Sequence, residues 1–389
     1  MRVYKFQLKP NKEQENKLLK TLNLCRFTYN KLLEELNNQT KIDRNKIQHK
    51  IVELKKNFPE LKTVHSKTLQ YENYRLFANL KGLSKTKNKR KVGKLRFKGY
   101  KWFKTFVMNQ TGYKLIKTNK HYDKLKISKI GLINIRQHRK IEGNIKGIII
   151  KKKVISWEAH IITDAKYQIK KGIDEIGIDV GVLNFLHTSN NEIINNPLYM
   201  NKELDKLKII HRKISGTKKG SNNRKKKINS LLKIWEVIDN QKKDFFHKVS
   251  THLVNNSKFI AVEKLNIKSM TKNKKKNHFY NHRNILDSSW GMFLQMLKFK
   301  AESAGIEYVE VNPKNTSKMC CKCGKLQDMP TNIRLYKCNS CNNIIDRDYN
   351  ASINILAKGK GLAFVGEEWL HSLMNQEAIT STPKVLGYV

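Results

Sequence analysis

Acidic residues are scarce in this sequence. It has 32 Asp and Glu against 79 Lys and Arg among 389 residues, so its formal net charge is +47. Positive charges in such excess repel one another in a folded chain unless a polyanion binds. The composition therefore predicts a nucleic-acid partner. The alternative is that an AT-rich coding sequence, which favours Lys, Asn and Ile, accounts for much of the excess.

Long apolar runs are also missing. No run of about 18 apolar residues exists, which excludes a membrane-spanning helix, and the first six residues lack the apolar core of a signal peptide. We expect no membrane partner and a cytoplasmic, nucleoid-associated protein of a prokaryote. The hydrophobic fraction of 39% supports a folded chain, and the length suggests about two or three folding units.

Cysteine is scarce as well, and five of the six cysteines lie between residues 320 and 341. Four of them form two Cys-x-x-Cys pairs: Cys320, Cys323, Cys338 and Cys341. In a reducing compartment this pattern favours one structural Zn²⁺ bound by four thiolates over disulfides. Cys321 is the alternative ligand in the first pair. The spacing predicts a zinc ribbon over residues 313–343.

Hydrophobic periodicity predicts a sheet with a helical insertion in the N-terminal part of the chain. Apolar residues alternate from Tyr4 to Leu8 as in a strand, and Asn11 and Gln14 then form a capping-box pattern that opens a long helix. A second helix is predicted from the helical spacing of Leu69, Leu76, Phe77 and Leu80. Further on, polar and apolar residues alternate as in antiparallel strands, up to about residue 170. The predicted units are a helical unit over residues 10–83 and a small β-barrel formed by residues 1–9 and 84–170.

Two basic segments are candidates for nucleic-acid binding. Between residues 85 and 106, basic residues are interleaved with aromatic residues, which can pair with phosphates and stack on unpaired bases. A Gly-containing basic turn between the predicted helices 201–214 and 223–256 suits contact with a nucleic-acid backbone. A solvated loop and a solvated turn are the alternatives. The candidate side chains are Arg96, Lys98, Tyr100, Trp102, Lys218, Lys219, Arg224 and Lys225.

Three acidic residues stand out by their positions. Asp179 interrupts an apolar strand, Glu263 ends another, and Asp348 begins the last predicted helix. An ionised acid in an apolar strand is costly unless it is paired or binds a metal. The alternative for any one of them, Asp348 above all, is a strand-end or helix-start carboxylate without a chemical role.

The order of elements around these acids is that of an RNase H-like α/β core: three strands, helices, a strand, a helix, a strand and a final helix. In such a core the three carboxylates could hold two Mg²⁺ ions and hydrolyse phosphodiester bonds. We predict this nuclease core over residues 171–312 and 344–360, with the zinc ribbon inserted. Residues 264–283 are predicted to form a loop, and residues 361–389 a tail without an organised motif.

At these motifs the chain resembles the OrfB or TnpB proteins of insertion sequences, which are compact relatives of the type V CRISPR effectors. The matching segments are residues 25–30, 96–98, 177–181, 262–265, 289–291, 320–324 and 346–351. The resemblance implies a wedge role for the barrel, a recognition role for the helical unit and a RuvC-type nuclease core. It also implies that Asp179, Glu263 and Asp348 are the catalytic acids.

The resemblance further implies an RNA-guided DNA endonuclease of a transposable element, acting as a monomeric ribonucleoprotein. A noncoding RNA encoded near the 3′ end of the element would supply the guide, and the protein would read a short motif next to its double-stranded target before strand separation. Two alternatives remain open. One is a nuclease-inactive, RNA-guided repressor, and the other is a guide-free, resolvase-like nuclease or transposition accessory.

Overall fold

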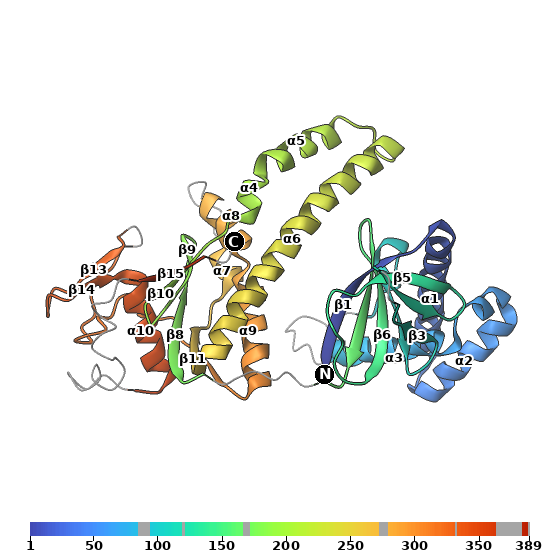
Figure 1. Ribbon diagram of the computed structural model, residues 1–389, viewed down its shortest axis with the longest axis horizontal. Coiled ribbons are helices and arrows are strands. Elements are labelled where there is room, and N and C mark those ends of the chain that lie inside the picture. The colour runs from blue at the N-terminus through green and yellow to red at the C-terminus, as the bar shows by residue number, and fades with distance from the viewer. Residues whose placement is uncertain are drawn as a thin grey trace. The chain divides into compact units, whose positions relative to one another are not determined.

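The computed structural model divides into two compact units, residues 1–167 and 168–389 (Figure 1). The structure describes residues 1–84, 94–118, 121–165, 172–271, 279–330, 333–362 and 383–387. Within these residues, no helix combines the length and the apolar character that crossing a membrane requires.

The first unit contains a curled antiparallel sheet (Figure 1). Its strands are β1 (Arg2–Lys9), β2 (Thr105–Asn109), β3 (Tyr113–Ile116), β4 (Asp123–Ile127), β5 (Gly131–Arg136), β6 (Ile145–Lys152) and β7 (Trp157–Thr163). They follow the order β2-β6-β7-β1-β5-β4-β3. The N-terminal strand joins this sheet, as predicted, and lies in its middle. In β1 the buried Tyr4, Phe6 and Leu8 alternate with exposed residues, because successive side chains of a strand point to opposite faces. Closure into a barrel stays a prediction.

Three helices lie between β1 and β2 in the chain: α1 (Lys12–Asn38), α2 (Arg44–Asn57) and α3 (Ser66–Ser84). Two short 3₁₀ helices, η1 (Pro59–Thr63) and η2 (Tyr100–Trp102), complete the unit. The predicted capping box of α1 is present, with the Gln14 amide donating to Asn11 Oδ1 at 2.8 Å and the Asn11 amide donating to Gln14 Oε1 at 3.1 Å. The periodicity indicated two helices in this segment, and α2 is the one that it missed.

The second unit is built on a mixed sheet. Its strands are β8 (Asp174–Val180), β9 (Asn184–Thr188), β10 (Glu192–Asn195), β11 (Ser257–Glu263), β12 (Glu307–Val311) and β15 (Lys384–Leu386), in the order β12-β11-β8-β9-β10-β15. The β8, β9 and β10 strands pair antiparallel, whereas β11 runs parallel to both β8 and β12. The predicted order of strands and helices is therefore present.

The helices of this unit are α4 (Tyr199–Lys202), α5 (Leu204–Ser215), α6 (Asn222–Asn256), α7 (Ile267–Met270), α8 (Phe279–Ser288), α9 (Trp290–Ala304) and α10 (Arg347–Gly359). The sheet is contacted by α6, α9 and α10, whereas α5 packs on α6 and projects away from the sheet (Figure 1). On one face, Phe185 of β9 packs against Phe246 of α6 and Phe293 of α9, with ring centroids 5.6 and 4.9 Å away. On the other face, Ile355 and Leu356 of α10 pack against β11. The sheet is thus the middle of three layers.

Two sequence predictions need correction. The predicted tail, residues 361–389, contains a strand, because β15 pairs parallel with β10, from Glu192 opposite Lys384 to Ile194 opposite Leu386. The predicted loop over residues 264–283 contains α7 and the beginning of α8, and residues 272–278 of it lie outside the described part of the chain. Neither helix has a clear apolar period within that segment, because α7 is a single turn and only the first five residues of α8, 279–283, fall in it.

The segment between β12 and α10 forms a small separate knuckle. It contains a two-stranded antiparallel sheet, β13 (Leu335–Lys337) and β14 (Ile344–Asp346), and its own buried cluster around Tyr336 and the cysteines. Since β14 runs directly into α10, the knuckle is attached to the helix that begins with Asp348.

Candidate active site and metal centre

Two of the predicted acids lie at the carboxyl ends of neighbouring parallel strands. Asp179 is the penultimate residue of β8, and Glu263 is the last residue of β11. The pairing of Ile178 with Val262 places the two acids next to each other in register. Asp348 is the second residue of α10 and is 9% exposed.

All three acids belong to the face of the sheet that α10 covers. The helix lies directly on β8, because an ideal Cβ at Gly177 would come within 2.5 Å of the Leu356 amide nitrogen and closer still to the Ser352 carbonyl oxygen. Residues two apart in a strand share a face, so Asp179 points to the same side as Gly177. By the same rule Glu263 shares the face of Ala261, which also packs against α10. The beginning of α10 brings Asp348 to this corner.

The electrostatics agree with this placement. Desolvation raises the pKa of Asp179 well above its usual range, and the carboxylates of Glu263 and Asp348 raise it further, with Arg347 acting in the opposite direction. Burial also raises the pKa of Glu263, opposed by the Thr316 hydroxyl, which donates to Glu263 Oε1 at 2.5 Å. A buried carboxyl whose ionisation is disfavoured by two neighbouring carboxylates is an arrangement that a cation would stabilise.

The carboxylates do not form a closed set of ligands in this structure. Among the described residues, the only group of three or more His, Cys, Asp or Glu side chains whose ligand atoms all lie within 4.8 Å is the cysteine group. One oxygen of Asp348 is instead held by Arg334, whose Nη1 lies 2.9 Å from Asp348 Oδ2. Arg334 was not among the predicted site residues, because nothing in its local sequence relates it to an acid that lies 14 residues further on.

Asp346, the other acid of the same motif, has a structural role. It is the N-cap of α10, and its Oδ1 accepts from the backbone amides of Asp348 at 2.8 Å and Tyr349 at 3.0 Å. The buried His187 lies 3.5 Å from the same oxygen and stacks on the Tyr349 ring. Asp346 therefore fixes the first turn of α10, which carries Asp348.

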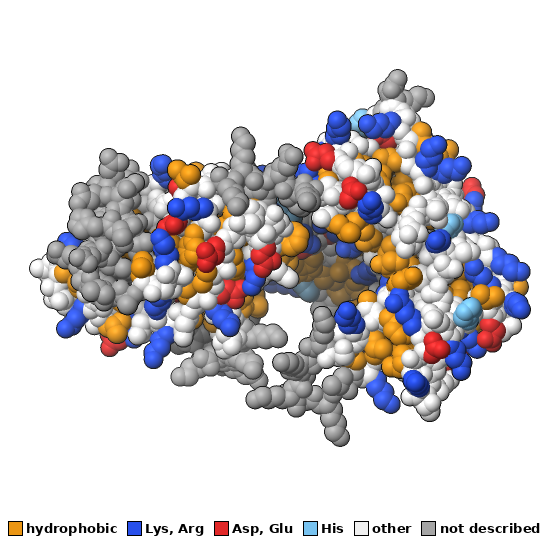
Figure 2. All heavy atoms as spheres, turned by 90° about the horizontal axis from the view of Figure 1, so that it is seen from below, with side chains coloured by type: hydrophobic (Ala, Val, Ile, Leu, Met, Phe, Trp, Pro, Cys, Tyr) orange, Lys and Arg blue, Asp and Glu red, His pale blue; other side chains and the backbone are white. Residues whose placement is uncertain are grey.

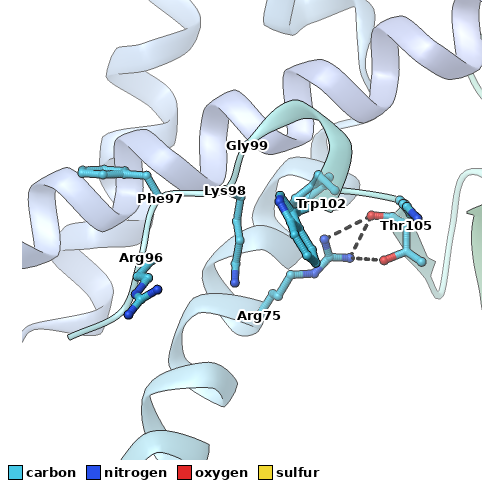
Figure 3. A pocket seen from close by; sticks show the side chains of 9 residues that line it. Arg75, Arg96, Phe97, Lys98, Gly99, Trp102 and Thr105 are labelled. Carbon is cyan, nitrogen blue, oxygen red and sulfur yellow. Dashed lines mark hydrogen bonds between the residues drawn. The ribbon is translucent and has the colours of Figure 1, made fainter. Parts of the chain in front are cut away.

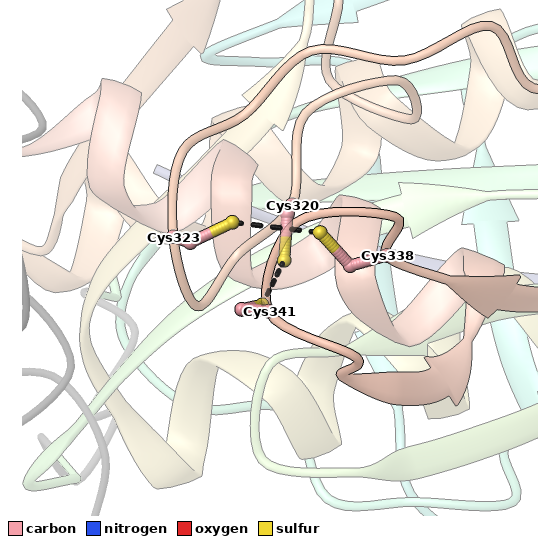
Figure 4. Close-up of side chains that lie close together, drawn as sticks. All are labelled: Cys320, Cys323, Cys338 and Cys341. Carbon is pink, nitrogen blue, oxygen red and sulfur yellow. Dashed lines mark hydrogen bonds between the residues drawn. The ribbon is translucent and has the colours of Figure 1, made fainter.

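The four cysteines of the two pairs come together around one point (Figure 4). The Sγ atoms of Cys320 and Cys341 are 3.7 Å apart, and those of Cys323 and Cys338 are 3.5 Å apart. A tetrahedron with zinc–sulfur bonds of about 2.3 Å has an edge of about 3.8 Å, so this group could hold a zinc ion. Although burial opposes it, backbone amides of Cys341 and Ser340 lower the pKa of Cys338 to about 7, which favours the thiolate that binds metal.

Cys321, the alternative ligand, lies outside this group. Its backbone amide donates to Asn350 Oδ1 at 2.8 Å. The side-chain amides of Asn350 and Asn354 both donate to the Met319 carbonyl oxygen, at 2.8 and 2.7 Å. One turn of α10 thus anchors the first cysteine pair, a role that the one-turn spacing of the two asparagines could have suggested.

The first basic segment borders a cavity in the N-terminal unit (Figure 3). Arg96, Lys98 and Trp102 line it. Trp102 is 84% exposed and Tyr100 is 64% exposed, so both rings are accessible for contact with a ligand. The predicted role of these four residues in nucleic-acid binding stays a prediction.

The second basic segment is the turn between α5 and α6. Lys218, Lys219 and Lys225 are exposed there. Arg224 is different, because its Nη1 donates to the carbonyl oxygens of Ile214 at 2.6 Å and Thr217 at 3.0 Å. Its guanidinium therefore caps the carboxyl end of α5. The three lysine side chains are accessible to a polyanion, and Lys225 Nζ also donates to Asn222 Oδ1 at 3.2 Å. More widely, basic side chains exceed acidic ones on the visible surface in Figure 2.

Comparison with protein families gives three matches along the chain. A model described as "Helix-turn-helix domain" matches residues 1–44, one described as "Probable transposase" matches residues 163–274, and one described as "Cas12f1-like, TNB domain" matches residues 290–355. The first two belong to models of the OrfB proteins of IS605-type elements. The third covers the cysteine knuckle and most of α10.

Two bacterial relatives carry the name "Putative RNA-guided DNA endonuclease". The one from Streptomyces pristinaespiralis is 33% identical over 196 residues, which are 49% of this chain and 47% of that protein. The other, InsQ of Escherichia coli K12, is 26% identical over 94% of both chains. Among solved structures, Cas12f1 in complex with single-guide RNA and target DNA is similar in fold, with a TM-score of 0.60 and 19% identity over 88% of this chain and 83% of that one.

Proposed function

The chain belongs to the OrfB, or TnpB, family of insertion-sequence proteins, and from this membership we propose that it is an RNA-guided DNA endonuclease of a transposable element. The names of its bacterial relatives support the activity. The net charge of +47 supports a polyanionic partner.

One observation carries the assignment to this chain: Asp179, Glu263 and Asp348 lie at the same corner of the sheet, on the face that α10 covers. The order β10-β9-β8-β11-β12, with β11 and β12 parallel to β8, is the order of an RNase H-like sheet. We therefore assign residues 171–312 and 344–360 to a RuvC-like nuclease core.

The chemistry of the three acids suits a hard divalent cation, because such ions prefer carboxylate oxygens. Burial and, to a lesser extent, the neighbouring carboxylates raise the pKa of Asp179, and positive charge at this corner would stabilise its ionised form. Two Mg²⁺ ions held by Asp179, Glu263 and Asp348 would activate water and stabilise the leaving oxygen of the scissile phosphate. To bind a cation, Asp348 would exchange its contact with Arg334.

The surrounding side chains position this site. Thr316 orients the Glu263 carboxylate through its hydrogen bond, and Asp346 holds the first turn of α10. Arg334 places a positive charge beside Asp348, and this guanidinium could pair with a phosphate oxygen of the bound strand if Asp348 held a cation.

The partners follow from the proposed function. A noncoding RNA encoded near the 3′ end of the element would supply base pairing to double-stranded DNA, next to a short adjacent motif. The segment with Arg96, Lys98, Tyr100 and Trp102, and the lysines of the α5–α6 turn, are the proposed contacts with these polyanions. The cysteine group would hold one structural Zn²⁺, since four thiolates leave no position for a reacting water. We propose a monomeric ribonucleoprotein.

The test has two steps. The gene is expressed with its native flanking DNA, the protein is purified through high salt, and the bound RNA is sequenced. One discrete species from the 3′ flank is expected. The complex is then incubated with Mg²⁺ and DNA that matches this RNA, with randomised flanking sequence to find the adjacent motif.

Asp179→Ala should abolish cleavage while RNA and target binding persist, because only the metal-binding corner changes. Asp205→Ala is the matched control, since this aspartate is exposed in the first turn of α5 and should not affect cleavage. Discrete RNA with target binding but no cleavage by the wild type would indicate a guided repressor. Cleavage without RNA would indicate a guide-free nuclease, and cleavage by Asp179→Ala would remove this residue from the active site.

A further inference from the structure

The N-terminal unit contains a cavity of about 520 Å³ between α3 and the segment that leads into β2 (Figure 3). Four of its lining residues are basic, three are aromatic, and none of the described lining residues is acidic. In Figure 3 the side chains of Lys98 and Trp102 project from the segment toward Arg75 of α3. The cavity thus combines positive charge with aromatic surface.

The rim of the cavity is held in place by α1. The Lys98 amide donates to Asn30 Oδ1 at 2.7 Å, and Asn30 Nδ2 returns a hydrogen bond to the Lys98 carbonyl oxygen at 3.1 Å. Arg26 Nη1 donates to the same carbonyl at 3.3 Å. Because both backbone groups of Lys98 are bound, the site is ordered before a partner arrives, which lowers the entropic cost of binding.

The inner wall is formed by Arg75, whose position is also fixed. Its two terminal nitrogens donate to the Thr105 carbonyl oxygen at 3.1 Å, and its guanidinium lies over the Phe103 ring at 4.7 Å. Glu72 Oε2 lies 3.3 Å from it and is fully buried. Burial raises the pKa of Glu72 to about 8, so this carboxyl is mostly protonated at neutral pH. A neutral carboxyl does not cancel the charge of Arg75, which is left to attract an anion.

The outer side presents aromatic rings to solvent. Trp102, Tyr100 and Phe97 are 84%, 64% and 59% exposed. Tryptophan is highly buried on average in folded proteins, so this cluster indicates a surface that becomes covered. Exposed aromatic rings beside arginine and lysine are the means by which proteins hold single-stranded nucleic acid, with the bases stacked on the rings.

We propose that this cavity takes one unpaired nucleotide of the bound nucleic acid, with its base on Trp102 and its phosphate between Arg96 and Lys98. A cavity of this volume is in the range of small-ligand pockets, about 300–1,000 Å³, and is too small for a base pair with its flanking backbone. Arg75 is a positioning and charge-bearing residue of the inner wall. The inference rests on the proposed function, because the nucleotide belongs either to the guide RNA or to the separated DNA.

The experiment uses the full chain, freed of RNA, with fluorescein-labelled decamers of uridine and of thymidine, and a duplex of the same length. Fluorescence anisotropy in 150 mM salt measures binding. Loss of one stacked base predicts that Trp102→Ala weakens single-strand binding about 5- to 150-fold, whereas Trp102→Phe retains most of it. Arg96→Ala should also weaken it. Tyr74→Ala is the control, since this 48% exposed ring of the same unit lies outside the cavity.

A second readout locates the contact. Decamers containing 5-iodouridine or 5-iododeoxyuridine are photocrosslinked to the wild type, and peptide mass spectrometry maps the site. A crosslink at Trp102 supports the proposal, and its presence with RNA alone, with DNA alone or with both identifies the source of the nucleotide. Crosslinks only at other residues, together with binding by Trp102→Ala and Arg96→Ala within twofold of wild type, would overturn the pocket.

Failure of this site is distinguishable from failure of the proposed function. If wild-type protein carries a discrete guide and cleaves DNA while Trp102 makes no contact, only the pocket is wrong. If no guide is found and no cleavage occurs while Trp102 still crosslinks, the nucleotide pocket stands and the endonuclease proposal is wrong.

Discussion

The direct contact between α10 and β8 makes Gly177 a sensitive position. In Gly177→Ala, the new Cβ would lie 2.5 Å from the Leu356 amide nitrogen and closer to the Ser352 carbonyl oxygen. Both are backbone atoms of a helix and cannot rotate aside, so the helix must move. Overpacking typically costs about 1–3 kcal/mol, and the rigid partners place this substitution at the upper end, about 3 kcal/mol. For a unit of this size, that lowers Tm by roughly 6–12 °C.

Moving α10 also moves Asp348 relative to Asp179, since Asp348 lies in the first turn of the helix. A displacement of about 1 Å in a catalytic group can cost about a hundredfold in rate. We therefore expect cleavage by the guide-loaded Gly177→Ala complex to fall by about that factor, with RNA binding retained. Thermal unfolding followed by circular dichroism and single-turnover cleavage measure the two effects.

Gly216→Ala is the matched control. This glycine ends α5 with a φ of −76°, and its nearest neighbouring atom for an added Cβ is the Arg212 carbonyl oxygen at 3.8 Å. Its stability should change by less than about 0.5 kcal/mol. If Gly177→Ala unfolds at the wild-type temperature, α10 does not rest on β8 and the argument for the shared face of the acids fails.

Two further predictions concern the metal centre and the helical insertion. Cys338→Ser should lose bound zinc, measured by elemental analysis of dialysed protein, and should unfold at lower temperature. Cys321→Ser should keep its zinc. Equal zinc loss in both variants would make Cys321 a ligand. Burial raises the pKa of Glu72 to about 8, so the folded state favours the protonated carboxyl. As pH rises from about 4.5 to 8, the unfolded chain releases this proton more readily than the folded protein. The free energy of unfolding should therefore fall over this range, by up to about 1.4 kcal/mol per pH unit. Glu72→Gln should flatten this decline in urea unfolding between pH 5 and 8, and parallel profiles for mutant and wild type would contradict the argument.

Much of the local structure was predictable from local patterns. The alternation in β1, the capping box of α1 and the two Cys-x-x-Cys pairs are each contained within a few residues, so the sequence reports them directly. The order of the main strands and helices in the second unit was also predictable, because these elements have a hydrophobic period of their own. The missed elements have weak periods: β15 has only three residues, and α2 is rich in charged residues.

The site was predictable in its residue types but not in its contacts. An acid within an apolar strand, Asp179, and one at the end of another, Glu263, are local signals, because an ionised carboxylate in such a strand is costly unless it is paired or binds a metal. The contact of Arg334 with Asp348 has no such signal, because the ribbon strand and the start of α10 meet only when the knuckle folds. Likewise, nothing near Arg224 shows that its guanidinium closes α5 rather than facing solvent.

By itself, the sequence determined that this is a basic, multi-unit chain with a four-cysteine knuckle and three acids in nuclease-like positions, because charge, period and spacing are properties of the chain read in order. Only the tertiary structure decided that Gly177 lets α10 lie on β8 and that the three acids share one face. The same holds for the cavity, which Arg75 lines together with residues between 96 and 105 further along the chain. These features depend on distances between residues far apart in the chain, which packing sets and local patterns do not contain.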